Sequence, residues 1–122
     1  MSNRIRIFAV AALVGLGLAS PALAHAHLQS ATPAEGSTVA TAPTEIDLTF
    51  SEAVELKFTG VDMTGPGKAV VKTGAATLAA GNRTLKVPLE GTLAAGVYTV
   101  AWHALSSDGH KTKGSYSFTL KP

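Results

Sequence analysis

The side chains that could bind or transform a ligand are few in this sequence, and they lie at two places in the chain. His25 and His27 are near the amino terminus, while Asp108 and His110 flank a glycine close to the carboxyl terminus. Imidazole and carboxylate groups are metal ligands, and an amine beside an imidazole forms a nitrogen pair suited to copper(II), which favours tetragonal nitrogen and oxygen donors. The sequence has no cysteine, which excludes thiolate metal sites, redox dithiols and a cysteine nucleophile. These residues indicate metal binding through nitrogen and oxygen.

The first 24 residues determine whether His25 can offer a free amine. They carry arginines at positions 4 and 6, continue with an apolar stretch at 7–18, and end with small residues in an A-x-A pattern at 22–24. This is the three-part pattern of a secretory signal peptide, and the apolar stretch is shorter than the roughly 20 residues of a membrane-spanning helix. We therefore predict that 1–24 is a cleaved signal peptide and that 25–122 is the mature domain, with the amine and the imidazole Nδ1 of its first residue able to chelate one ion.

His27 leaves two alternatives open. Residues 24–26 also satisfy the A-x-A pattern, so cleavage two residues later, after Ala26, would leave His27 first. If His25 is first, His27 is third, and a histidine third from a free amine binds copper(II) through the amine, two deprotonated backbone amides and its own imidazole. That second mode needs no folded structure.

Further ligands come from two downstream segments. Asp108 and His110 are two residues apart, so they point the same way on an extended segment, and Gly109 allows the backbone to bend between them. The alternative is an ordinary D-G hairpin turn followed by an incidental histidine. Glu52 shares parity with the apolar Phe50 at the rim of a predicted strand and is a weaker fourth candidate, with a plain surface charge as the alternative.

The elements that must position these residues are short strands. Alternating apolar and polar residues between Pro, Gly, Asn and Asp turn signals are typical of an all-β sandwich of about seven strands. The run at 97–105 is the most apolar and predicts a central strand, in which Trp102 and a half-exposed, structural His103 face opposite ways. Pro88 indicates an edge strand. The alternating runs lie at 46–50, 54–58, 85–89, 97–105 and 116–120.

Net charge excludes some partners. The chain has ten Lys and Arg against eight Asp and Glu, and the two arginines of the predicted signal peptide account for the difference. The mature chain is formally neutral, so we expect no basic patch and no nucleic-acid or anionic-membrane partner.

Taken together, these residues resemble the CopC copper-resistance proteins. The resemblance covers nearly the whole mature chain and is carried by His25-Ala26-His27-Leu28, Ser30-Ala31-Thr32-Pro33-Ala34-Glu35-Gly36, Leu48-Thr49-Phe50-Ser51-Glu52, Trp102 and Ser106-Ser107-Asp108-Gly109-His110. It implies a periplasmic, immunoglobulin-like Greek-key β-sandwich or barrel of seven strands.

The resemblance also implies a ligand set for copper(II). It assigns His25 through amine and imidazole, together with Asp108 and His110, and makes Glu52 a nearby or weak ligand. It favours cleavage before His25. Some members carry a second, copper(I) site in a methionine-rich loop, but beyond Met1 this chain has only Met63, which we predict to be a packing residue.

The function predicted from these observations is a monomeric periplasmic protein, not an enzyme, that buffers copper(II) or delivers it to an inner-membrane importer of the CopD type. One alternative is a copper oxidase or monooxygenase built on a histidine brace, since such enzymes also use an amino-terminal histidine. Another is an immunoglobulin-like adhesion or carbohydrate-binding module that binds no metal.

Overall fold

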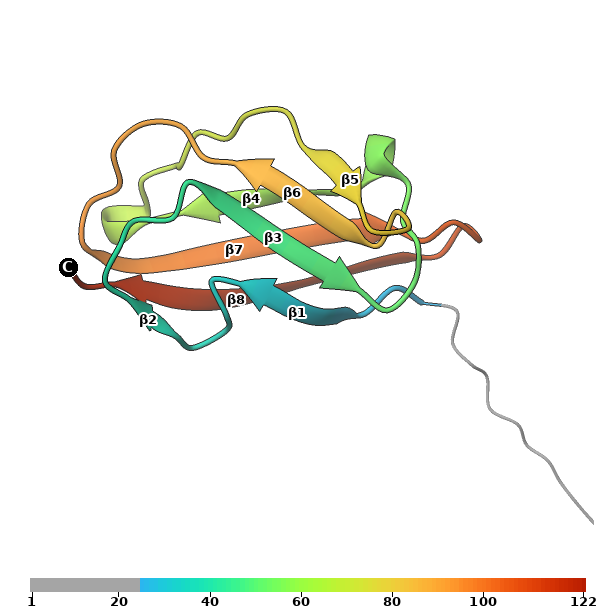
Figure 1. The fold of residues 1–122 in the computed structure, drawn as a ribbon, viewed down its shortest axis with the longest axis horizontal. Helices are drawn as coiled ribbons and strands as arrows, with labels where there is room; N and C mark the ends of the chain where they lie inside the picture. Colours follow the sequence, from blue (N-terminus) through green and yellow to red (C-terminus); the bar gives the residue numbers. More distant parts are fainter. Residues whose placement is uncertain (1–24) are drawn as a thin grey trace, which may run out of the picture.

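The computed structural model describes residues 25–122, so the predicted signal peptide and its cleavage lie outside the described part of the chain. Two four-stranded sheets pack face to face in this region (Figure 1). The first has the order β1-β3-β6-β5 and the second β2-β8-β7-β4. The strands are β1 (Leu28–Thr32), β2 (Thr38–Val39), β3 (Glu45–Phe50), β4 (Gly60–Thr64), β5 (Thr77–Ala79), β6 (Thr84–Pro88), β7 (Gly96–Leu105) and β8 (Lys111–Leu120), joined in places by the 3-10 turns η1 (Leu56–Phe58) and η2 (Pro66–Lys68).

The chain crosses from one sheet to the other at each step from β1 to β5, while β5-β6 and β7-β8 are hairpins within one sheet; this mixture of crossings and hairpins is typical of an immunoglobulin-like Greek-key sandwich. The predicted all-β sandwich is confirmed. The described residues form eight strands where about seven were expected, because the first loop contains the two-residue β2, which pairs in parallel with β8. Within 25–122, no helix is long and apolar enough to cross a membrane.

The core lies between the sheets and follows the alternation of the sequence. Every second side chain is buried in β3, from Tyr98 to Ala104 in β7 and from Tyr116 onward in β8. Strand β7 lies between β8 and β4, as predicted for a central strand. Phe50 packs edge-on against Trp102 with ring centres 5.4 Å apart, which joins the two sheets. Met63 is buried in this core, as predicted. The fully or nearly buried apolar residues are Ala26, Ile46, Leu48, Phe50, Val54, Met63, Leu85, Val87, Tyr98, Val100, Trp102, Ala104, Tyr116, Phe118 and Leu120.

Two strand predictions were wrong. Strand β6 is not an edge strand, because it pairs with β3 on one side and β5 on the other. Pro88 is tolerated there because it is the last residue of β6, beyond the point where the pairing with β5 ends. The run at 54–58 forms no strand: Val54 makes one isolated bridge to Ser106, and the following residues turn into η1 with exposed side chains.

Trp102 packs against a position where any side chain would collide with it. A Cβ at Gly114 would lie 2.7 Å from Trp102 Cζ2. We expect Gly114→Ala to lower the free energy of unfolding by about 1–3 kcal/mol, because the tryptophan or its strand must shift. Urea denaturation followed by circular dichroism measures this, with the exposed neighbour Ser115→Ala as control. An unchanged midpoint for Gly114→Ala would show that the contact is relieved without cost.

One end of the sandwich collects the segments that carry the candidate ligands. The start of β1, the end of β3 and the turn between β7 and β8 lie together at this end, while the carboxyl terminus lies at the other (Figure 1). The ten residues of β8 span roughly 30 Å between the two ends. The fold therefore brings together residues separated by more than half of the chain.

Candidate metal centre

The segment at 25–27 is fixed to the sandwich by its middle residue. Ala26 is completely buried, while the side chains of His25 and His27 on either side of it are exposed. The Thr112 hydroxyl donates a hydrogen bond of 2.8 Å to the Ala26 carbonyl, which joins the segment to β8. Both histidines are therefore held at the surface by a buried alanine.

Ser51 holds the same segment from the end of β3. Its hydroxyl accepts a hydrogen bond from the His27 amide at 2.8 Å and donates one to the His25 carbonyl at 3.3 Å. Its own amide donates to the His27 carbonyl at 2.8 Å. Glu52 follows Ser51 in the sequence and is exposed. Its carboxylate is therefore carried by the residue adjacent to the serine that holds the histidine segment.

The His25 and His110 rings lie side by side although they are far apart in the sequence. Their centres are 4.8 Å apart and the rings are tilted by 35°. A metal-bound imidazole nitrogen lies roughly 2.0 Å from its ion, which puts the ring centre about 3.2 Å away. Two imidazoles in neighbouring positions around a tetragonal ion therefore have centres about 4.5 Å apart. The observed separation is close to that value.

The turn that carries His110 also fixes the orientation of its ring. Asp108 Oδ1 accepts hydrogen bonds from the Ser106 hydroxyl and from His110 Nδ1, the latter at 3.0 Å. These two bonds, with that from Ser106 the stronger cause, hold the pKa of Asp108 below its ordinary value. With its Nδ1 proton committed to Asp108, His110 presents Nε2 as a free lone pair, which is the arrangement found in metal-binding histidines.

The backbone of this turn is closed by its own hydrogen bonds. The Ser106 amide donates to the His110 carbonyl and the Gly109 amide donates to the Ser106 carbonyl, both at 2.9 Å. Gly109 has a φ of 96°, a conformation that side chains with a Cβ rarely adopt. The segment is thus the D-G turn that the sequence indicated. The same turn holds His110 beside His25.

The structure brings together three of the five candidate residues. His25, Asp108 and His110 form a contiguous group, His27 has its ring centre 6.3 Å from that of His25, and Glu52 makes no hydrogen bond or ion pair with this group among the contacts found in 25–122. Within the same residues, no three His, Asp or Glu side chains are already arranged to hold one ion. The predicted set relies on a further donor, the amine of His25, which exists only after cleavage.

His103 lies outside this group. It is exposed on the outer face of β7, where its ring lies over Gly60 of β4. The expected orientation away from Trp102 is confirmed, since Trp102 is 9% exposed and packs in the core. Its surroundings are those of a surface groove and not of the His25 and His110 pair.

Sequence reasoning missed four residues that position the candidate ligands: Ala26, Ser51, Ser106 and Thr112. Alternation along an extended segment could have identified Ala26, because a residue between two outward histidines points inward. A serine two residues before an aspartate is a common local hydrogen-bonding pattern and could have indicated Ser106. Ser51 and Thr112 act through contacts between distant segments, which no local pattern reveals.

Comparison with known proteins gives one consistent result. Residues 28–121 match the family model described as the CopC domain. Protein YobA of Escherichia coli (strain K12) is 45% identical over 112 residues, which cover 90% of each chain. Copper resistance protein C of Escherichia coli is 40% identical over 114 residues, covering 87% of this chain and 89% of that protein. The crystal structure of PcoC, a methionine-rich copper resistance protein from Escherichia coli, matches with a TM-score of 0.72 and 36% identity, covering 80% of this chain and 99% of the other.

Proposed function

Because this chain belongs to the CopC family of copper resistance proteins, we propose that it is a periplasmic copper(II) carrier that holds the ion with His25, Asp108 and His110. The observation that carries the proposal is the 4.8 Å separation of the His25 and His110 rings. Signal peptide cleavage before His25 adds the α-amine, which completes a set of nitrogen and oxygen donors suited to copper(II).

The arrangement favours the divalent ion over copper(I). Copper(I) prefers soft thiolate and thioether ligands. The chain has no cysteine, and Met63 is only 1% exposed in the core, away from any surface where an ion could enter. The methionine-rich character of PcoC has no counterpart here, so we propose a single copper site.

Asp108 supports this site through His110. Its Oδ1 is engaged by Ser106 and by His110 Nδ1, on the side of the ring away from Nε2, so in this arrangement Asp108 orients the imidazole and does not reach an ion bound at Nε2. For Asp108 and His110 to bind one ion together, copper(II) must displace the Nδ1 proton and take its place between the two side chains. Glu52 is exposed at the same end of the sandwich, where it supplies at most a weak ligand and adds negative charge near a cation.

The folded site is favoured over the terminal mode centred on His27. That mode needs the backbone nitrogens of Ala26 and His27 as ligands. In the structure, Ala26 is completely buried and the His27 amide donates a hydrogen bond to the Ser51 hydroxyl. Binding through both nitrogens would require the segment to leave the sandwich, which exposes Ala26 and breaks the bond from Thr112.

Cleavage before His27 is disfavoured on the same grounds. It would remove His25 and Ala26, and with them the buried methyl group and the carbonyl that Thr112 binds. The mature domain in our proposal therefore begins at His25.

The exposed position of the ligands suits a carrier. The side chains of His110 and Asp108 are 52% and 48% exposed, so an incoming protein can reach the ion and replace ligands one at a time. We propose that the protein buffers copper(II) and passes it to an inner-membrane importer of the CopD type. A polysaccharide-oxidising enzyme is expected to present a flat surface of several aromatic rings. Among the described residues Phe58 is the one exposed aromatic ring, while Phe50, Tyr98, Trp102, Tyr116 and Phe118 pack in the core.

The proposal is tested by titrating the protein, exported and confirmed by intact mass to begin at His25, with copper(II) under electron paramagnetic resonance. We expect one tight equivalent with a tetragonal signal that shows nitrogen coupling. Absence of a tight equivalent would reject copper(II) binding and favour a module that binds no metal. Oxidation of polysaccharide or formation of peroxide in the presence of a reductant would favour the histidine-brace enzyme.

Copper affinity is expected to fall on acidification from about pH 8 to about pH 5, because protons compete with the ion for two imidazoles and an amine. The pKa of Asp108 lies below its ordinary value, so this carboxylate stays ionised over the range and adds little to the pH dependence. Competition with a chelator of known affinity measures the effect. Circular dichroism at each pH provides the control that the sandwich remains folded. A flat profile would mean that imidazole and amine are not the ligands.

A further inference from the structure

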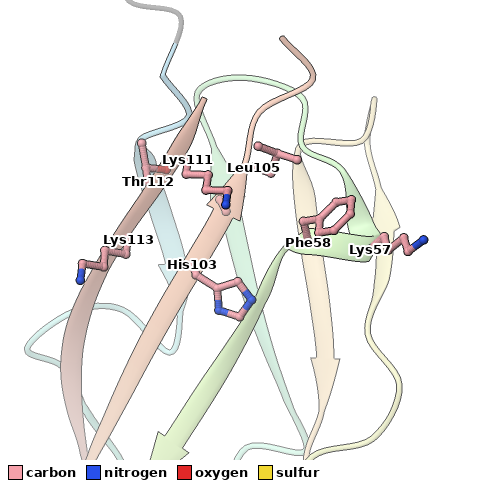
Figure 2. Close-up of a pocket in the computed structure, with 8 residues that line it drawn as sticks. Lys57, Phe58, His103, Leu105, Lys111, Thr112 and Lys113 are labelled. Atoms are coloured by element: carbon pink, nitrogen blue, oxygen red, sulfur yellow. The ribbon is translucent and has the colours of Figure 1, made fainter. Parts of the chain in front are cut away.

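A groove of about 590 Å³ lies on the outer face of the second sheet, next to the candidate metal centre but separate from it. Its floor is His103 of β7. Figure 2 shows this ring between Phe58, which comes from η1, and Lys113, which comes from β8. Lys57 and Lys111 also line it.

The lysines of this groove have no acidic partners. The ion pairs found in 25–122 involve Lys86 and His110, and none involves Lys57, Lys111 or Lys113. No Asp or Glu lines the groove among the described residues. The charge is local, since Asp62 lines the adjoining hollow together with His103 and Lys113. The net charge of the sequence does not reveal that folding brings Lys57, Lys111 and Lys113 to one groove. Together these three cations attract anions.

The spacing of the cations suits a chain of carboxylates better than one small anion. Lys111 and Lys113 lie on the same face of β8, and Thr112 between them points to the opposite face. The two lysine side chains therefore leave the strand about 7 Å apart. In the pairing of β7 with β8, Lys113 lies opposite His103 and Lys111 lies opposite Leu105. Figure 2 shows Lys57 beyond Phe58 and Lys113 on β8 with their amines directed outward on opposite sides of His103, so these charges lie at the rim of the groove.

The groove also offers an apolar anchor. Phe58 is 53% exposed, which is unusual for a large aromatic side chain, and the Lys57 amine lies 5.7 Å from the centre of its ring. Gly60 gives the floor its shape: a Cβ there would lie 3.3 Å from His103 Cε1, so the glycine allows the imidazole to lie across β4. Exposed aromatic side chains beside desolvated pockets commonly anchor protein partners.

We propose that this groove is a docking site for an acidic segment of a protein partner. The segment places an apolar side chain against Phe58 and carboxylates on Lys57, Lys111 and Lys113. A concave site of this kind fits an extended polypeptide, whereas a lipid surface needs side chains that protrude. The docking does not depend on copper. However, the bound segment lies beside the candidate metal centre, because Lys111 follows His110 and the neighbouring Thr112 holds the Ala26 carbonyl.

The test uses a fluorescently labelled peptide in which glutamates alternate with leucine and phenylalanine, with a lysine-for-glutamate peptide as comparison. Binding to the exported protein is followed by fluorescence anisotropy without copper. We expect the acidic peptide alone to bind, and the double variant Lys57→Glu with Lys113→Glu to bind it about tenfold more weakly. Raising the salt concentration should weaken the wild-type complex. Phe58→Ala should also weaken it.

The control for net charge reverses two exposed lysines elsewhere, Lys72→Glu with Lys121→Glu, and should bind the peptide with nearly wild-type affinity. Equal losses in both double variants would show attraction by overall charge alone and overturn the proposal. Failure of the wild-type protein to bind the acidic peptide would overturn it as well. If the wild-type protein instead binds phosphatidylglycerol vesicles, and the variant Lys57→Glu with Lys113→Glu does not, the face contacts lipid and the protein-docking proposal is wrong. Since the assay contains no copper, these outcomes are independent of the metal site.

Discussion

One extra glycine added before His25 is expected to weaken copper(II) binding by more than about 100-fold. The extra residue converts the α-amine of His25 into an amide, which is a far poorer ligand, while every side chain of the site remains. Loss of a group that merely orients a metal ligand already costs about 10–100-fold in affinity, and loss of a donor itself should cost at least as much. The measurement is competition with a chelator for one equivalent of copper(II), on protein whose first residue is verified by intact mass.

The matched control adds the same glycine after Pro122, which leaves the amine of His25 free. This variant should bind copper(II) as the parent does. Both extended proteins should unfold at the same urea concentration as the parent, because the docking of Ala26 by Thr112 does not use the amine. Unchanged affinity in the amino-terminal variant would mean that the amine is not a ligand and would leave the two imidazoles to hold the ion alone.

A ligand set that includes the free amine, as we propose, would account for the absence of a complete metal cage among the side chains of 25–122. His25 and His110 lie at a ligand-like separation, but no third His, Asp or Glu side chain in 25–122 joins them in a cluster of metal-binding geometry. A site that needs the amine cannot bind copper tightly while the preceding residues are attached. Copper loading would thereby follow export and processing.

The strands that position the site were predictable because burial imposes a period of two on their residues. Strands β3 and β7 alternate between buried and more exposed positions, and the predicted runs at 46–50 and 97–105 match them to within one residue. In β8 the alternation with buried residues begins only at Tyr116, so the prediction found 116–120 and missed the first half of the strand, which has no buried residue. The run at 54–58 shows the same alternation but turns into η1, whose side chains are exposed. Apolar alternation over so few residues cannot distinguish a strand from a turn that carries an exposed aromatic side chain.

The candidate ligands were predictable in identity, but their supports were not. His25 and His110 stand out as rare residues beside a predicted cleavage point and a turn. Ser51 and Thr112 are ordinary polar residues in the sequence, and only the antiparallel packing at this end of the sandwich brings them to the backbone of residues 25–27. The basic groove was missed for a similar reason, since its lysines come from η1 and β8 and meet only in the folded chain.

The second large effect is expected for His110→Ala, which should reduce copper(II) affinity by more than about 100-fold and remove part of the nitrogen coupling in the paramagnetic resonance spectrum. His110 is the donor held beside His25 by the Asp108 hydrogen bond. Its side chain is 52% exposed, so its loss should leave no cavity and should change the free energy of unfolding little. Asp108→Asn should weaken binding less, because the amide oxygen still accepts a bond from His110 and remains a neutral donor.

The matched control is His103→Ala, which removes an exposed histidine from the same sheet without touching the site. It should bind copper(II) like the parent, so a general loss of imidazole cannot account for the effect at His110.

His27→Ala tests the remaining alternative, in which copper binds in the terminal mode centred on His27. If the ion is still bound tightly after His110→Ala but is lost in the double variant His27→Ala with His110→Ala, copper sits in the terminal mode and residues 25–27 must leave the sandwich. That departure would break the Thr112 bond to Ala26, so copper would then lower the stability of the fold. In the folded site copper raises stability, because it binds the native state in preference to the unfolded chain. The sign of the copper-induced shift in the unfolding midpoint therefore distinguishes the two modes without reference to affinity.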